Sequence, residues 1–248
     1  MIRDKLIDTA VRLGIDEQLR GIRATLYPKY RHDRIEGQNL RLLLKSVLTE
    51  NSNCVDVGAY RGRILAEIVR VAPYGRHIAY EPLPHIHRYL VEHFPSVEIR
   101  LAAVSNEEGE KSFTYVKNMP GRSGFLERSY PARQHIEKLT VRTETLDGNL
   151  PAGYVPALIK IDVEGAEHQV IEGAIETISK YKPVVLFEHG KGGAAHYNTQ
   201  PHHIYELLHD QAGLSIFDLD GNGPYTLGQL EDAYVLDDRW DYVARPCP

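Results

Sequence analysis

The sequence predicts an α/β fold with a mostly parallel sheet. Two observations lead to this fold class. Between residues 54 and 103, short runs rich in β-branched residues alternate with longer runs of helical apolar spacing, and the same alternation resumes between residues 157 and 187. Such alternation is typical of parallel strands joined by crossover helices.

Apolar residues at helical spacing open the chain. Between Met1 and Tyr30 they recur with charges between them, which predicts one or two amphipathic helices. A second stripe, from Leu40 to Leu48, ends at the turn-forming residues 51–53. We therefore expect a helical extension over residues 1–50, which offers a surface for homo-oligomer formation, and an α/β domain over residues 51–248.

Strands and helices alternate in the first half of this domain. Strands are expected at residues 54–57, 77–80 and 97–103, with helices at 64–71 and 85–94. Two further short strands, at residues 112–116 and 140–144, are separated by a polar segment that contains several Gly and Pro residues. This segment, residues 117–139, is long enough to form a lid.

The second half of the domain continues the pattern. It predicts strands at residues 157–161 and 183–187 and helices at 166–179 and 201–209. Two last apolar runs, residues 214–219 and 241–244, flank the turn sequence Asp-Gly-Asn-Gly at 220–223. We expect these two runs to pair as antiparallel strands at one edge of the sheet.

Composition excludes several classes of protein. With 42% apolar and 25% charged residues, the chain is too hydrophobic for a disordered protein. Its two cysteines, Cys54 and Cys247, cannot make a disulfide framework or a four-cysteine zinc site. A net charge of −5 gives no reason to attract nucleic acid or an anionic membrane. No apolar run reaches the roughly 18 residues of a membrane span, and the first residues lack a secretory signal, so we expect a cytoplasmic protein with small-molecule partners.

The loop that runs from Asp56 to Gly62, after the first strand, indicates the kind of cofactor. In open α/β sheets ligands bind beyond the carboxyl ends of the strands, and Gly58 lets the backbone approach a ligand closely. A nicotinamide dinucleotide fingerprint would need glycine where Tyr60 and Arg63 stand. Asp56 instead suits a ligand with a cationic amino-acid end, such as S-adenosylmethionine, because it can accept a hydrogen bond from an ammonium; alternatively, Asp56 orders the amides of the loop.

Two later strand ends extend the expected cofactor site. Glu81 lies nineteen residues after Gly62, where this fold commonly places a carboxylate that accepts hydrogen bonds from ribose hydroxyls. Taken alone it equally suits a solvated helix start, with Pro82 as the first helical residue. The small residues Ala103 and Val104 leave an apolar slot for an adenine ring, although ordinary packing also explains them. The candidate cofactor residues are Asp56, Gly58, Tyr60, Gly62, Glu81, Pro82, Ala103, Val104 and Asp162.

An apolar strand at residues 157–161 leads three carboxylates, Asp162, Glu164 and Glu167, into a turn and a helix start. Glu167 suits a solvated position in the first helical turn. The next strand is followed by Glu188 and His189, so Asp162, Glu188 and His189 could converge and hold magnesium or manganese. An alternative that the sequence supports equally well is that Glu188 orders its loop and that His189 caps or makes a local hydrogen bond.

Several motifs between Asn53 and Glu188 form a set. They are Asp56-Val57-Gly58-Ala59 with Gly62, Glu81-Pro82, Ala103-Val104-Ser105 with Gly109, Thr145-Leu146-Asp147, Ile159-Lys160-Ile161-Asp162-Val163-Glu164-Gly165-Ala166-Glu167, Gly173-Ala174 and Glu188. This set resembles the FkbM-type S-adenosylmethionine-dependent methyltransferases. The resemblance implies the class I methyltransferase fold: a Rossmann-like three-layer sandwich whose seven-stranded, mostly parallel sheet has an antiparallel edge strand. Tyr60 and His189 depart from the family pattern.

The resemblance also implies O-methylation of a hydroxyl on a sugar, an oligosaccharide or a related natural product. An alcohol needs a base or a metal to remove its proton. We expect the acceptor above Asp162 and Glu188, with Glu164 or, by slight preference, His135 as the base, although His135 also suits a plain surface position. Two other functions stay open: a nucleoside-binding protein without turnover and, less favoured, a nicotinamide-dependent oxidoreductase.

Overall fold

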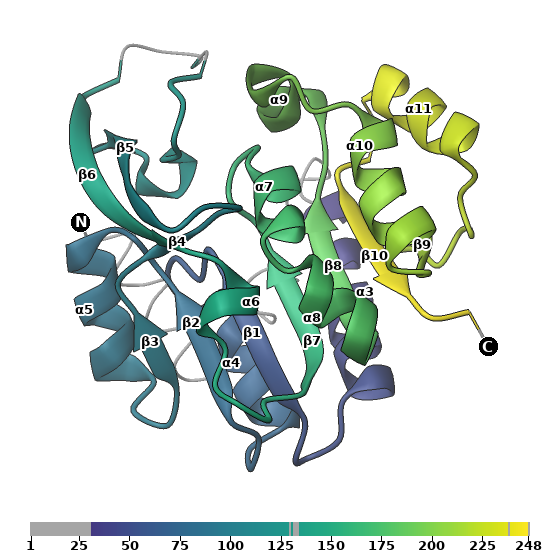
Figure 1. The fold of residues 1–248 in the computed structure, drawn as a ribbon, viewed down its shortest axis with the longest axis horizontal. Helices are drawn as coiled ribbons and strands as arrows, with labels where there is room; N and C mark the ends of the chain where they lie inside the picture. Colours follow the sequence, from purple (N-terminus) through teal and green to yellow (C-terminus); the bar gives the residue numbers. More distant parts are fainter. Residues whose placement is uncertain (1–30, 129, 131–133, 238, 248) are drawn as a thin grey trace.

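The computed structural model describes residues 31–128, 130, 134–237 and 239–247. Its main feature is a seven-stranded sheet with the strand order β3-β2-β1-β7-β8-β10-β9 (Figure 1). The strands are β1 (Asn53–Val57), β2 (His77–Tyr80), β3 (Glu98–Arg100), β7 (Pro156–Ile161), β8 (Val184–Glu188), β9 (Ser215–Asp218) and β10 (Asp241–Arg245).

The strand directions agree with the predicted fold class. β1 pairs in parallel with β2 and β7, β2 pairs in parallel with β3, and β7 with β8. β10 runs antiparallel between β8 and β9, so the last two predicted strands pair as expected and β9 occupies the edge beside β10. The order of strands reverses between β1 and β7, which is where open α/β sheets bind their ligands.

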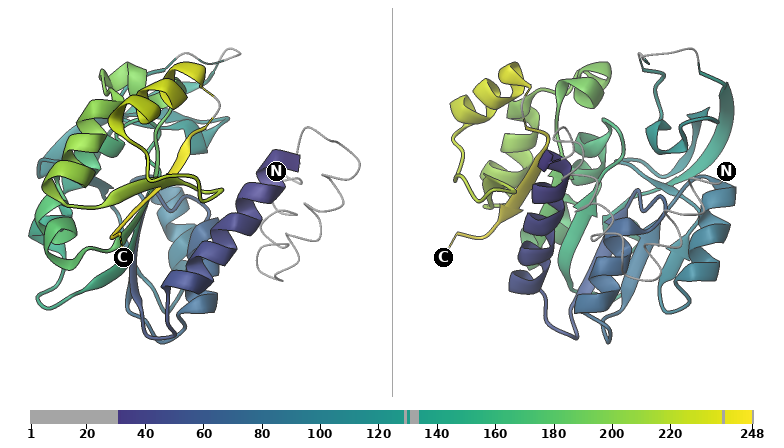
Figure 2. Two further views of the ribbon diagram at one scale, coloured as in Figure 1. Left: turned by 90° about the vertical axis from the view of Figure 1, so that its right-hand side faces the viewer. Right: turned by 180° about the vertical axis from the view of Figure 1, so that it is seen from behind.

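Helices cover both faces of the sheet (Figures 1 and 2). One layer contains α3 (Arg31–Val47), α4 (Arg63–Val71) and α5 (Pro84–His93); the other contains α7 (Glu167–Glu172), α8 (Ile175–Tyr181), α10 (Pro201–Tyr205) and the π-helical turn η4 (Glu206–Gln211). Successive strand residues face opposite layers: Cys54 packs in the cluster with α3 and α4, whereas Val55 packs in the cluster with α7 and α8. Burial on both faces explains why these strands are apolar runs in the sequence.

Helix α3 is the described part of the predicted N-terminal extension. Its residues Leu40 and Leu44, with Leu48 directly after its end, are buried and pack with strand residues of β1, β7, β8 and β10. The second apolar stripe of the sequence is therefore the face by which α3 contacts the sheet. The helices expected within residues 1–30 lie outside the described residues, and the domain boundary at residue 50 stays a prediction.

A second, three-stranded sheet has the order β4 (Ala103–Val104), β6 (Ile136–Glu144) and β5 (Gly109–Val116). It contains both of the extra strands that the sequence predicts. The single strand predicted over residues 97–103 is divided, because β3 pairs with β2 in the main sheet while β4 pairs with β6. Between β5 and β6, the segment expected to be a lid forms the 3₁₀ turn η2 (Pro120–Arg122); its role as a lid stays a prediction.

Two helical predictions differ from the structure. The helix predicted over residues 166–179 is interrupted after Glu172, where the backbone of Gly173 passes so close to the Ser105 carbonyl that a Cβ would overlap it. Helix α11 (Leu227–Leu236), between β9 and β10, is absent from the prediction. The remaining elements are short: α6 (Leu146–Asn149), α9 (Lys191–Ala194) and η3 (Ala195–Tyr197). No helix within the described ranges is long and apolar enough to cross a bilayer.

Candidate cofactor and acceptor site

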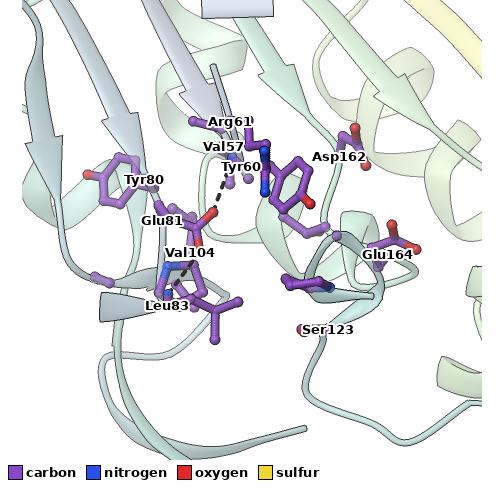
Figure 3. Close-up of a pocket in the computed structure, with 18 of the residues that line it drawn as sticks. Val57, Tyr60, Arg61, Tyr80, Glu81, Leu83, Val104, Ser123, Asp162 and Glu164 are labelled. Carbon is purple, nitrogen blue, oxygen red and sulfur yellow. Dashed lines mark hydrogen bonds between the residues drawn. The ribbon is translucent and has the colours of Figure 1, made fainter. Parts of the chain in front are cut away.

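A cavity of about 330 Å³ lies at the carboxyl ends of β1, β2 and β7, where the strand order reverses. Seven of the nine predicted cofactor residues line it: Gly58, Tyr60, Glu81, Pro82, Ala103, Val104 and Asp162. Tyr80 and Glu81 lie on one side of the cavity, and Asp162 and Glu164 lie on the opposite side (Figure 3). The cavity therefore spans the gap between the second strand and the acidic loop after β7.

One end of the cavity is apolar. Leu83, Phe113 and Phe125 join Ala103 and Val104 there, and the rings of Phe113 and Phe125 meet edge to face with centroids 5.7 Å apart. The sequence prediction missed these rings because the small sheet and the segment before β6 bring them to the cavity from a distance along the chain. The two rings make this end of the cavity apolar, which agrees with the predicted slot for an adenine ring.

Close contacts shape the loop after β1. Gly58 has a φ of +76°, and a Cβ at this position would overlap the carbonyl oxygen of Asp162. Only glycine satisfies both conditions. Gly62, a predicted cofactor residue, is not among the residues that line the cavity. It lies against the ring of Phe94 at the start of α4, so its role is to let α4 pack closely on α5.

Glu81 is the best-defined polar group of the cavity. Its side chain is 4% exposed, and its two carboxylate oxygens accept hydrogen bonds from the backbone N–H groups of Tyr60 at 3.1 Å and Leu83 at 2.8 Å (Figure 3). Burial raises the pKa of Glu81 to about 7, against the opposing effect of these N–H groups. Each carboxylate oxygen keeps a further lone pair that a ligand hydroxyl can use. The alternative of a solvated helix-start carboxylate is wrong, because Glu81 is buried.

Asp56 does not reach the cavity, which corrects its predicted role as partner of a ligand's ammonium group. It is 1% exposed, and a carboxylate oxygen lies 3.0 Å from Nζ of Lys160 on the neighbouring strand β7. Lys160 also donates to the backbone carbonyls of Val57, at 3.2 Å, and Gly58, at 2.7 Å. Burial disfavours its ammonium form, but the Asp56 and Asp162 carboxylates outweigh this effect and raise the pKa of Lys160. The buried pair therefore holds the glycine loop in place.

The acidic loop after β7 contributes two residues to the cavity wall, Asp162 and Glu164. The side chain of Asp162 is 44% exposed and lies 3.8 Å from Nζ of Lys160. Glu164 forms an ion pair with Arg128, which belongs to the segment expected to be a lid. Burial raises the pKa of Glu164, and the Arg128 guanidinium opposes this shift. The described part of that segment thus contacts the acidic loop through Arg128.

Glu167 is not the solvated helix-start residue that the sequence suggests. It is 2% exposed, and one carboxylate oxygen accepts hydrogen bonds from the backbone N–H groups of Val163 and Gly165, both at 3.0 Å. Burial raises the pKa of Glu167 to about 7. Because the contacts span the turn between β7 and α7, Glu167 fixes the conformation of the acidic loop.

The predicted metal site is wrong. No group of three or more His, Cys, Asp or Glu side chains in the described part of the chain is arranged to hold a metal ion. The reason is the alternation of side chains along a strand. Glu188 lies on the same face of β8 as Leu186, which packs with α3, whereas His189 lies on the opposite face and stacks on Tyr234 of α11 with ring centroids 5.2 Å apart.

The alternative of a local hydrogen bond for His189 applies to its backbone N–H, which donates to the Trp240 carbonyl at 2.7 Å, and not to its ring. Both of its ring nitrogens are buried without a hydrogen-bond partner among the described residues. Burial lowers the pKa of His189 to about 4, and His168 and His203 contribute to the shift. The ring is therefore neutral and packs as part of the core between β8 and α11.

His135, the slightly preferred base, lies away from the cavity. It is exposed just before β6, its backbone N–H donates to the side chain of Asn118 at 3.1 Å, and it does not line the cavity. The alternative prediction, that His135 is an ordinary surface residue, is confirmed. Of the two proposed bases, Glu164 lines the cavity.

The fold and the cavity together define a class of protein. A seven-stranded sheet of this order, with an antiparallel strand between the last two parallel ones, glycine-containing loop after β1 and acidic residue after β2, is the Rossmann-like fold of the class I S-adenosylmethionine-dependent methyltransferases. A family model described as the methyltransferase FkbM domain matches residues 56–213, which is more than half of the chain. The chain belongs to the FkbM methyltransferase family.

Three solved structures illustrate what the chain is similar to, whereas no curated protein matches it. The FkbM methyltransferase from Methylobacillus flagellatus KT is 14% identical, with a TM-score of 0.49 over 98% of this chain and 59% of that chain. The plantazolicin methyltransferase BpumL in complex with SAH is 9% identical, with a TM-score of 0.45 over 98% and 97% of the two chains. The precorrin-6y C5,15-methyltransferase from Geobacter metallireducens GS-15 is 14% identical, with a TM-score of 0.45 over 84% and 87%.

Proposed function

We propose that the protein transfers a methyl group from S-adenosylmethionine to a hydroxyl of a sugar, an oligosaccharide or a related natural product. The observation that carries the proposal is the buried Glu81 carboxylate at the wall of the cavity, beside the glycine loop and opposite the acidic loop. Membership of the FkbM methyltransferase family supports methyl transfer. The sugar hydroxyl is the acceptor that the resemblance to this family implies.

The cavity fits the parts of the cofactor. Glu81 has free lone pairs for the two ribose hydroxyls, since each of its oxygens already accepts only one backbone hydrogen bond. The apolar end formed by Leu83, Phe113 and Phe125 suits the adenine ring. Gly58 and Asp162 both line the cavity, and the amino-acid end of the cofactor would lie beside them. When bound, the cofactor supplies an electrophilic methyl group on a sulfonium.

The residues of the chain must then orient and activate the hydroxyl. Orientation in line with the methyl group is worth about 7 to 11 kcal/mol in well-ordered sites. A base is also needed, and the carboxylates at this edge of the cavity, Asp162 and Glu164, are the groups that face it. No step is assigned to a metal ion, because His189 packs on Tyr234, away from Asp162 and Glu188.

Location and partners belong to the same proposal. We expect a cytoplasmic protein with a small-molecule or saccharide acceptor, and neither nucleic acid nor a membrane as partner. The net charge of −5 supports this expectation. We also expect that two copies of the chain pair through the N-terminal helices; most of these residues lie outside the part of the chain that the structure describes.

Calorimetry and methyl transfer test the proposed function together. SAH should bind to the wild-type protein, and Glu81→Ala should weaken binding tenfold or more, because hydrogen bonds to a charged group contribute about 1.5 to 3 kcal/mol. Glu92→Ala, an exposed glutamate on α5, is the matched control and should leave binding unchanged. Labelled S-adenosylmethionine should transfer its methyl group to glycosides.

Two results would replace the proposal. Tight SAH binding without methyl transfer to any mono- or oligosaccharide would favour a nucleoside-binding protein. Thermal stabilisation by NAD, with no competition from S-adenosylmethionine, would favour an oxidoreductase.

A further inference from the structure

The amino-acid end of S-adenosylmethionine carries two opposite charges, an ammonium and a carboxylate. The proposed function places this end beside Gly58 and Asp162, which line the cofactor cavity. The Asp162 side chain is 44% exposed, so its negative charge suits the ammonium. The carboxylate then needs a positive partner in the same part of the cavity.

Three positively charged side chains line the cofactor cavity: Arg61, Arg63 and Lys160. Lys160 is buried, lies 3.0 Å from its carboxylate partner on β1 and donates to two backbone carbonyls, so its charge is already neutralised. The guanidinium carbon of Arg61 lies 5.8 Å from the centre of the Tyr60 ring. Burial, followed by the Arg61 charge, lowers the pKa of His85 on α5. Arg61 therefore acts on the side of the cavity beside α5.

Arg63 lies on the other side of the cavity. Gly62 ends the glycine loop with a φ of +73°, and α4 begins with Arg63 directly after it. Arg63 is exposed and also lines a second cavity of about 200 Å³, between α3 and the ends of β8 and β10, so it lies between the two cavities. Burial raises the pKa of Asp56 and of Asp241, and the Arg63 guanidinium opposes both shifts. Its charge therefore lies near the edge of the sheet where the acidic loop begins.

The Arg63 guanidinium has no hydrogen bond or ion pair with another side chain in the described part of the protein. Helix α4 has no acidic residue in its first turn. Glu67, one turn further along, is already paired with Arg41 and Arg70. The Arg63 guanidinium is therefore available to an anionic group of a ligand in the cavity.

We propose that the Arg63 guanidinium binds the carboxylate at the amino-acid end of S-adenosylmethionine, while Asp162 lies beside the ammonium. The inference rests on the proposed function and names the residue that orients this end of the cofactor. A guanidinium has two parallel N–H donors that match the two oxygens of a carboxylate. The two charges of the cavity wall thus complement the two charges of the ligand. A nucleoside without the carboxylate leaves Arg63 without a partner, so Arg63 also discriminates against such nucleosides.

Calorimetry with two ligands tests the role of Arg63. The ligands are SAH and S-adenosyl-3-thiopropylamine, which is SAH without its carboxylate. The wild type should prefer SAH about tenfold, which is a modest value for a charged pair because Arg63 is partly in water. Arg63→Met removes the charge and keeps an unbranched side chain, so it should bind SAH about tenfold more weakly and the analogue as tightly as the wild type does.

Two further variants complete the comparison. Arg63→Lys should keep part of the preference for SAH, because an ammonium keeps the charge but loses the two parallel donors. Arg88→Met, at an exposed arginine on α5 outside the cavity lining, is the matched control and should bind both ligands like the wild type. Unchanged binding of the analogue also shows that each variant is folded.

Two results overturn the assignment of Arg63. One is an SAH affinity of Arg63→Met equal to that of the wild type. The other is an equal loss of affinity for both ligands, which would mean that Arg63 supports the glycine loop and does not bind the carboxylate. Absence of SAH binding to the wild type would overturn the proposed function together with this inference. If Arg63→Met loses the preference for SAH but the wild type never methylates a glycoside, the assignment of Arg63 stands and the proposed methyl transfer fails.

Discussion

Replacement of Lys160 by methionine tests whether the buried ion pair with Asp56 supports the cofactor loop. The ammonium is 4% exposed and lies 3.0 Å from the Asp56 carboxylate, which is 1% exposed. Removal of one partner of a buried pair leaves an uncompensated charge and costs about 3 to 5 kcal/mol. For a chain of this length, each kcal/mol lowers the melting temperature by about 2 to 4 °C. We therefore expect Lys160→Met to melt about 6 to 20 °C below the wild type.

A double-mutant cycle shows whether the loss comes from the pair. Asp56→Asn alone should cost less than Lys160→Met, since Lys160 keeps Asp162 and two backbone carbonyls as partners. The double variant should recover much of the loss, because no buried charge is left alone. Unfolding in urea can be followed by the fluorescence of Trp240, the single tryptophan of the chain.

Lys117→Met provides the control for the cycle. Lys117 pairs with Glu137 at 2.7 Å, but both side chains are about half exposed, so no resolvable change in melting temperature is expected. If the stability loss of the double variant equals the sum of the losses of the two single variants, the reasoning is refuted. Such additivity would mean that Asp56 and Lys160 do not interact.

Three further variants test the cavity. Gly58→Ala should lose SAH binding and stability, because its Cβ would overlap the carbonyl oxygen of Asp162, whereas Gly192→Ala has open space and should change neither. SAH affinity should fall as the pH decreases through about 7, because protonation of Glu81 removes an acceptor for the ribose, and the dependence should disappear in Glu81→Gln; a pH-independent wild type contradicts this role. Arg128→Ala should raise KM for S-adenosylmethionine several-fold in steady-state kinetics, since it breaks the ion pair that holds Glu164 at the cavity wall; unchanged KM would show that this contact does not matter for binding.

Local patterns in the sequence predict the main sheet well. The strand at residues 77–80 has its predicted bounds, and the first and last strands differ by a residue at one end. The division of residues 97–103 was not predictable in this way, because Ala103 pairs with Thr143, forty residues further along the chain. Which sheet a short apolar run joins depends on such distant partners.

Some features of the site could have been predicted from local patterns in the sequence. Side chains alternate along a strand, so Glu188 and His189 had to face opposite layers and could not share a metal. Lys160 stands alone in an apolar strand, and a charged residue there almost always has a buried partner. Helix α11 begins with the capping-box residues Thr226 and Gln229. The pairing of Arg128 with Glu164, by contrast, links two loops whose approach no local pattern encodes.

The position of β10 has a consequence for how the protein is made. β10 follows β9 in the chain but lies between β8 and β9, and these two strands have no hydrogen bonds to each other. As the chain leaves the ribosome, β8 and β9 are made before β10, so the edges that later pair with β10 stay unpaired. Unpaired strand edges can pair with other chains. Only the pairing of β10 with both strands closes these two edges, so the sheet is complete only after the last strand has been made.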